Sequence, residues 1–417
     1  MHASYPQKIY VELTSRCNLQ CRMCVKYAPG SRIIEEDLPF SLFRNLDSAI
    51  AQAGTLILNG IGEPLLHPQL LDIVIFSRKR MAPQADEEKS LQLLSAGLST
   101  ICLSLDSLAE EEKTPGGEHS VRAVSRAIAG LAAARKQTGS SSFMIGLEMV
   151  LSRENINDLP RYIQWAAEQG VDYVIVTHLF LYNTSAEQQS LFNPNSSEAI
   201  ELFHSSNERA RARGLDLREY PSIYLKYRKN EMERAVVEIF QEMQDEARDR
   251  GIFLHLQSLL QHTSDDEELV EQVFAAARAV AEGHGIELFL PPNQALAQRS
   301  CPFMADEAVF IAANGAVMPC HFLWHTYACR VLGEEIQVQE CAFGTIREQP
   351  LEDIWQSRQY TLFRREAGEY DYSSCWSCTQ GPCADLINDN IHAANDCYGS
   401  QVPCGHCQWN LGGVRCL

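Results

Sequence analysis

The cysteines of this chain are confined to a few short stretches, and that distribution limits how its two ends can fold. Three of the 15 cysteines lie within "CNLQCRMC", which begins at Cys17, and one more is Cys102. The other eleven lie between Cys301 and Cys416, in a loop-rich segment with little regular periodicity of apolar residues. Thiols gathered in this way are either disulfide partners in small secreted scaffolds or metal ligands in a reducing compartment.

The remaining composition favours metal ligands, because the chain has the features of a cytoplasmic protein. The start "MHASYPQKIYVELTSRC" has no basic segment followed by an apolar one, and no apolar run approaches 18 residues. We therefore expect neither a signal peptide nor a transmembrane helix. The formal charge is 35 − 54 = −19, which disfavours nucleic acid or an anionic membrane as a partner.

The first 180 residues alternate short apolar strands with helices. We expect strands at 8–13, 55–60, 100–106, 143–151 and 172–180, and helices at 38–54, 68–80, 87–97, 121–137 and 156–170. This alternation predicts βαβ units and a parallel sheet or barrel. One strand is missing from the alternation, because "MAPQAD" at 81–86 is too short for a loop and a strand.

The triplet of Cys17, Cys21 and Cys24 indicates a reactive iron–sulfur cluster. Three closely spaced thiolates can hold three corners of a four-iron cluster, and the fourth iron then stays open for a ligand. The alternative is structural zinc, which prefers a closed set of four ligands. No further cysteine or histidine follows the triplet before His67.

The spacing C-x3-C-x2-C after a first strand resembles the radical S-adenosylmethionine (SAM) superfamily, and "NGIGEPLLHP" resembles its Gly-Gly-Glu-Pro motif, with Ile61 replacing the first glycine. The resemblance implies that the open iron chelates SAM and that Met23 lies near the adenine. It also implies that Gly62 allows close backbone approach and that Glu63 accepts a hydrogen bond from the SAM ammonium group.

Three further SAM contacts follow from the same resemblance. Ser104 and Asp106 end the strand "LSLDS", where the family commonly contacts the ribose, and Asn155 in "VLSRENINDL" matches an asparagine that contacts SAM. Each has a simpler explanation, a turn for the first pair and a helix cap for Asn155. The family's third strand is the one that "MAPQAD" replaces.

The C-terminal cysteines resemble the SPASM domain, which binds two auxiliary [4Fe–4S] clusters. Cys301, Gly315 and Cys320 match its C-x13-G-x4-C opening, although "CWSCTQGPC" is one residue shorter than the family's next motif. Two [4Fe–4S] clusters need eight cysteine ligands, so about three of the eleven cysteines in this segment are not ligands. Cys329 and Cys341 are the candidates for these. The candidate ligands are Cys301, Cys320, Cys341, Cys375, Cys378, Cys383, Cys397, Cys404, Cys407 and Cys416. Two zinc sites, at Cys375/Cys378 and Cys404/Cys407, are the alternative.

The resemblance implies a fold of three parts. We expect an α/β protein with a partial (βα)6 TIM-like barrel at 1–192, a helical connection at 193–292 and a SPASM domain at 293–417. Cys102 is expected to be a small buried core residue.

The implied function is that of a maturase. SPASM proteins mostly modify peptides, proteins or metalloenzymes, and the tail "DCYGSQVPCGHCQWNLGGVRCL" most resembles the maturases of tungsten-cofactor oxidoreductases. His321 replaces the aspartate that serves as base in sulfatase-maturing members, and it is the candidate base here. An electron donor such as ferredoxin or flavodoxin is implied. The alternatives are a peptide- or sulfatase-type maturase, an iron–sulfur electron-transfer protein and a zinc-stapled interaction protein.

Overall fold

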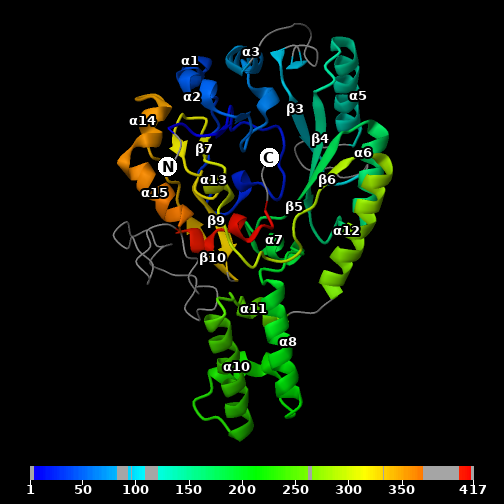
Figure 1. The fold of residues 1–417 in the computed structure, drawn as a ribbon, viewed down its shortest axis with the longest axis vertical. Coiled ribbons are helices and arrows are strands. Elements are labelled where there is room, and N and C mark those ends of the chain that lie inside the picture. Colours follow the sequence, from blue (N-terminus) through cyan, green and yellow to red (C-terminus); the bar gives the residue numbers. More distant parts are fainter. Residues whose placement is uncertain are drawn as a thin grey trace.

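The computed structural model describes residues 4–81, 93–94, 96–108, 121–261, 265–331, 333–369 and 403–414. Two four-stranded sheets organise this part of the chain (Figure 1). The first has the order β2 (Thr55–Ile57), β1 (Lys8–Val11), β7 (Ala308–Ile311) and β8 (Val317–Met318), and the second has β3 (Thr100–Ser104), β4 (Met144–Leu151), β5 (Tyr173–His178) and β6 (Glu287–Phe289). Within these two sheets, all pairings are parallel except that of β7 with β8.

The expected α/β class with parallel strands is confirmed. Each of the five expected strands appears at its expected place. In the described residues no ladder joins β2 to β3, where the alternation of the sequence misses a strand. The segment "MAPQAD" and the helix expected at 87–97 fall largely outside the described residues.

The first sheet joins residues from both ends of the chain. Ile9 of β1 lies opposite Leu56 of β2 and Val309 of β7. The outer face of β1 and β7 is wholly buried and packs on α1 (Phe40–Phe43), α2 (Asp47–Gln52) and α14 (Leu351–Gln356). The helix α3 (Leu70–Met81) continues this layer. A strand buried on both faces is expected to be almost entirely apolar, and "AVFI" in β7 meets that expectation.

The second sheet is covered on one face by helices. Alternate residues of β4 and β5, such as Leu147 and Val174, contact α5 (Val121–Thr138), α6 (Leu159–Gln169) and α12 (Asp265–His284). Gly170 follows α6 with φ of 79°, the left-handed conformation that ends many helices. Since α12 and β6 complete this layer, the packing of the α/β part extends beyond residue 192.

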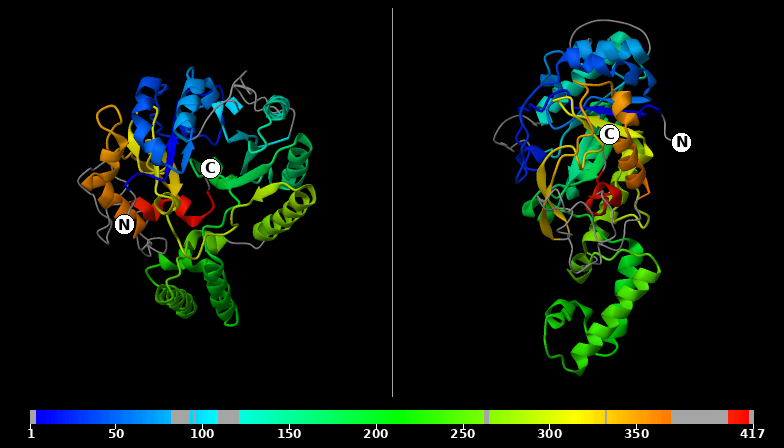
Figure 2. Two further views of the ribbon diagram at one scale, coloured as in Figure 1. Left: turned by 45° about the horizontal axis from the view of Figure 1, so that its top comes forward. Right: turned by 90° about the vertical axis from the view of Figure 1, so that its left-hand side faces the viewer.

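A helical projection carries its own core and extends away from the two sheets (Figures 1 and 2). It contains α8 (Ser197–Arg211), α9 (Tyr220–Tyr224), α10 (Glu231–Asp249) and α11 (Leu256–Gln261), with α7 (Thr184–Gln189) preceding it. A capping box fixes the start of α10, because Asn230 and Glu233 each accept a hydrogen bond from the other's backbone N–H. None of the described helices combines the length and the apolar character that a membrane span requires.

The C-terminal part packs against the inner face of β1. It contains the two-stranded ribbon of β9 (Tyr327–Val331) and β10 (Glu334–Val338), with α13 (Pro302–Ala305) before it and α15 (Arg358–Gly368) after it. Residues 403–414 return to the body of the molecule, where Trp409 and Leu411 are buried and the carbonyl of Gly413 accepts a hydrogen bond from the backbone of His178.

Candidate functional site

The predicted SAM-site residues gather at one edge of the sheets. The cysteine triplet follows β1, Gly62 and Glu63 follow β2, Ser104 and Asp106 lie at the end of β3, and Asn155 follows β4. All four strands run parallel to their neighbours, so these segments emerge at carboxyl ends, where the sites of parallel barrels lie. The tertiary structure therefore places six predicted contacts and three predicted ligands around a common edge.

Residues 14–24, the cysteine loop, are held by contacts that leave the three thiols partly accessible. The backbone N–H of Cys24 donates to the carbonyl of Cys21 at 3.1 Å, and the following 3-10 turn (Val25–Tyr27) anchors the loop through buried Val25. The Tyr27 hydroxyl donates to the carbonyl of Leu19 at 3.0 Å. Cys17, Cys21, Cys24 and Met23 are all half-buried.

The three thiols and Asp106 share one electrostatic environment. Burial, followed by the charges of Asp106, Cys24 and Cys17, raises the pKa of Cys21 to about 11. Burial also raises the pKa of Cys24. Bound iron would replace the thiol protons, because a metal ion deprotonates a coordinating thiol outright. The donor set, three thiols with no described fourth, fits a cluster with one open iron.

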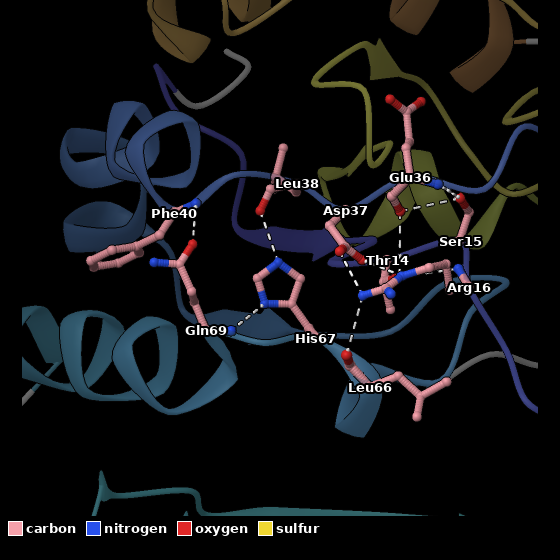
Figure 3. A network of polar contacts seen from close by, with 10 residues as sticks. All are labelled: Thr14, Ser15, Arg16, Glu36, Asp37, Leu38, Phe40, Leu66, His67 and Gln69. Atoms are coloured by element: carbon pink, nitrogen blue, oxygen red, sulfur yellow. Dashed lines mark hydrogen bonds and ion pairs between the residues drawn. The ribbon is translucent and has the colours of Figure 1, made fainter.

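Residues 34–38 contact both the cysteine loop and residues 58–67, the motif loop that follows β2 (Figure 3). The Ser15 hydroxyl donates to the carbonyl of Ile34 at 2.8 Å, and the Arg16 guanidinium binds Asp37 through two contacts of 3.0 and 2.6 Å. The ring of His67 contacts the carbonyl of Leu38 at 2.9 Å through Nε2, and its Nδ1 accepts the backbone N–H of Gln69 at 3.1 Å. Both ring nitrogens are therefore engaged, which excludes His67 as the fourth ligand.

Gly62 meets backbone on one side, as its position in the motif predicts. A Cβ at this position would lie 2.1 Å from the carbonyl oxygen of Thr14, so only glycine allows the motif loop to pack on the cysteine loop. The Glu63 backbone N–H donates to the carbonyl of Arg16 at 2.8 Å. One Glu63 carboxylate oxygen accepts the N–H of Leu65 at 3.0 Å, and the side chain remains half-buried.

Asn155 connects the ends of β3 and β4. Its side-chain amide donates to the carbonyls of Asp106 at 3.0 Å and Val150 at 2.8 Å, and its oxygen accepts the N–H of Ser152 at 2.8 Å. Asp106 in turn accepts the N–H of Val150 at 2.8 Å, and Ser104 is exposed. Both amide N–H groups of Asn155 donate to backbone carbonyls. The geometry therefore favours a structural role, in which Asn155 joins the ends of β3 and β4, over donation to SAM.

Glu148 lies near this edge but is absent from the predicted site. It lies opposite Ser104 in the ladder, on the face of β4 turned away from the helices. Burial, followed by the charge of Asp106, raises its pKa to about 7. A glutamate within the apolar strand "FMIGLEMVL" was the signal in the sequence.

The pKa of Glu148 predicts a pH dependence of stability. The pKa in the folded state exceeds the ordinary value of 4.5, so the folded protein retains the proton over a wider range and loses stability as the pH rises from about 4.5 to about 7. We expect Glu148→Gln to raise the urea midpoint of unfolding at pH 8, with a gain that shrinks at pH 5. A gain of equal size at both values would contradict the assigned pKa.

His321 lies in an enclosed aromatic environment. Its ring contacts those of Tyr10, Phe303, Phe310 and Trp324 with centroids 4.7–5.2 Å apart. It is 3% exposed, and burial, followed by the charges of Lys8 and His325, lowers its pKa to about 3. Enclosure and weak basicity both disfavour proton transfer to a substrate. The role of His321 as base stays a prediction.

Four C-terminal thiols share a second environment. The pKa of Cys320 is raised chiefly by burial and then by the charges of Cys407 and Cys301. The pKa of Cys404 is raised by burial and by the charges of Cys301, Cys407 and Cys320. About 100 residues separate Cys301 from Cys404, so the sequence did not indicate that Cys301 and Cys320 would share an environment with Cys404 and Cys407. In the described residues, no three Cys, His, Asp or Glu side chains are grouped to hold a single metal ion.

The other cysteines are distributed as follows. Cys329 is wholly buried in β9, Cys341 is half-buried, and burial raises the pKa of Cys341 to about 11 without any contribution from another thiol. Cys102, expected in the core, is half-buried on the face of β3 opposite the helices. Cys375, Cys378, Cys383, Cys397 and Cys416 lie outside the described residues.

Comparison with known proteins supports the same assignment. Residues 301–379 match the SPASM iron–sulfur cluster-binding domain. The chain is 26% identical to the tungsten-containing aldehyde ferredoxin oxidoreductase cofactor-modifying protein of Pyrococcus furiosus, over 98% of this chain and 96% of the relative. It is 22% identical to the AdoMet-dependent heme synthase of Methanosarcina barkeri, over 95% of each chain.

The chain is a radical SAM enzyme with a SPASM domain. It uses SAM and [4Fe–4S] clusters, so the two predictions of enzyme class and cofactors are confirmed. PqqA peptide cyclase of Gluconobacter oxydans is 27% identical over 51% of this chain and 60% of the relative. The structure of Streptococcus suis SuiB bound to S-adenosylmethionine aligns with 90% of this chain and 71% of that chain, with a TM-score of 0.45 and 13% identity.

Proposed function

We propose that this radical SAM enzyme is a maturase whose target is a metalloenzyme or another polypeptide. The observation that carries the proposal is similarity to a cofactor-modifying protein over 98% of this chain and 96% of the relative. Partial similarity to a peptide cyclase also favours a macromolecular target.

Within this proposal, each group of residues has one role. Cys17, Cys21 and Cys24 would hold the first cluster, which would supply the electron for the reductive cleavage of SAM. Glu63 accepts a hydrogen bond from the SAM ammonium group. Ser104 and Asp106 border the ribose. A low-potential protein such as ferredoxin or flavodoxin is the proposed electron donor.

We further propose that Cys301, Cys320, Cys404 and Cys407 hold one auxiliary cluster. Four half-buried thiols whose charges act on one another would supply a complete ligand set for one [4Fe–4S] cluster. The second set would come from the remaining candidates, Cys341, Cys375, Cys378, Cys383, Cys397 and Cys416.

Hydrogen transfer can identify the target class. The reconstituted, reduced enzyme would be given SAM and extract fractions from cells of its source grown in deuterated medium. We expect monodeuterated 5′-deoxyadenosine with the protein fraction, because the radical takes a hydrogen atom from the target. Deuterium transfer from the small-molecule fraction alone would contradict the proposal and indicate a metabolite as substrate.

Replacing Glu63 tests the SAM contact. We expect Glu63→Gln to weaken SAM binding by roughly tenfold or more, because a charge-assisted hydrogen bond contributes more than a neutral one. Glutamine can keep the contact with the Leu65 N–H, so the variant isolates the charge. Equilibrium dialysis measures the affinity, with iron content expected to be unchanged. Unaltered affinity would reduce the motif to a structural turn.

A further inference from the structure

Glu12 is a buried carboxylate that the assigned site does not use. It directly follows β1, and its backbone N–H donates to the carbonyl of Ile311 at 2.8 Å, which extends the pairing of β1 with β7. The residue is 1% exposed. Burying a carboxylate is costly unless hydrogen bonds or a counter-charge compensate it, so its contacts show what holds it in place.

Three segments distant in sequence meet at this carboxylate. Oε1 accepts the backbone N–H of Ile61 at 2.9 Å, in the motif loop after β2. Oε2 accepts the backbone N–H of Ala313 at 3.2 Å, in the hairpin between β7 and β8. The His325 Nε2 lies 3.4 Å from Oε2 and has no hydrogen-bond partner in the described residues. One side chain therefore joins the SAM motif loop to two parts of the SPASM domain.

The motif loop packs directly on the side chain of Glu12. A Cβ at Gly60 would lie 2.5 Å from Cγ of Glu12, so the loop backbone rests directly on the glutamate side chain. A Cβ at Gly62 would lie closer still, 2.1 Å from the carbonyl oxygen of Thr14 on the cysteine loop. The Ile61 N–H is thus fixed between two tight contacts, and Glu63 follows two residues later.

We propose that Glu12 is a positioning residue through which the SPASM hairpin holds the SAM-binding loop in its binding conformation. The Ala313 N–H and His325 orient the carboxylate from the SPASM side, and the carboxylate orients the Ile61 N–H. SAM affinity then depends on contacts made by residues 313 and 325, far along the chain from the SAM motifs. The inference rests on the proposed role of Glu63.

The test uses full-length, fully reconstituted variants. We expect Glu12→Gln to weaken SAM binding roughly tenfold at unchanged iron content, because the amide retains one acceptor and loses the other. The perturbation of the EPR spectrum of the reduced protein by SAM should need correspondingly more SAM. His325→Gln lies at a less confined position, 12% exposed, and should weaken SAM binding about threefold.

Asp172→Asn is the matched control. Asp172 also accepts a backbone N–H, that of Ile145 at 2.7 Å, and pairs with Arg135 at 2.6 Å, but it precedes β5 at the opposite end of the sheet. We expect Asp172→Asn to lower stability without changing SAM affinity.

Three results would overturn the proposal. They are wild-type affinity in both the Glu12 and the His325 variants, an equal loss in Asp172→Asn, or a loss of iron in Glu12→Gln, which would make Glu12 a support of the cluster loop. Failure of the Glu63 assignment is seen separately, as wild-type affinity in Glu63→Gln while Glu12→Gln is impaired.

Discussion

Replacing Cys17, Cys21 and Cys24 together by alanine is expected to remove about four irons per chain and to abolish SAM cleavage. The three thiols are half-buried, share one electrostatic environment and follow β1 at the edge where the SAM motifs meet. Loss of all three leaves the first cluster without a ligand from this loop. The measurement is iron content beside the yield of 5′-deoxyadenosine after dithionite reduction.

Cys102→Ala is the matched control for the triple variant. Cys102 is also a half-buried thiol in the α/β part of the chain, but it lies within β3 and away from the loop. We expect this variant to keep its full iron content and its SAM cleavage. Production of 5′-deoxyadenosine by the triple variant would show that the cluster lies elsewhere.

The double substitution of Cys404 and Cys407 by alanine is expected to remove about four further irons while leaving SAM cleavage in place. The first cluster is assigned to Cys17, Cys21 and Cys24, so we expect cleavage to need neither thiol. Modification of the target should be lost, because the proposed auxiliary cluster would lie in the domain that packs on the inner face of β1. Iron content and the yields of 5′-deoxyadenosine and of modified target are measured on the same preparation.

The double substitution is a sharper test than truncation of the tail. A chain cut after Cys383 would also lose Trp409 and Leu411, which pack into the core, and the Gly413 carbonyl that binds the backbone of His178. Cys329→Ala serves as control, since it removes a wholly buried thiol of β9 from the same region. Full iron content in the Cys404/Cys407 variant would leave these residues as a structural loop.

Much of the site could be predicted from local sequence because its signals are short. The Cys17–Cys24 spacing, the motif around Glu63 and the ends of the strands each depend on fewer than ten consecutive residues. Alternation of apolar side chains also located all five expected strands, since periodicity is a property of neighbouring residues. The motifs did not show which partner each polar side chain binds. Asn155, for example, donates both of its amide hydrogens to backbone carbonyls.

Contacts between distant segments were decided by the tertiary structure alone. β7 pairs with β1 across about 300 residues, α12 and β6 complete the second sheet, and the charge of Cys320 helps to raise the pKa of Cys404. No local pattern encodes such pairings, because they depend on which buried surfaces fit together after the elements have formed. Glu12 shows the same limit. Its sequence neighbours identify it as a polar residue at the end of an apolar strand, and only packing brings Ile61, Ala313 and His325 to its two oxygens.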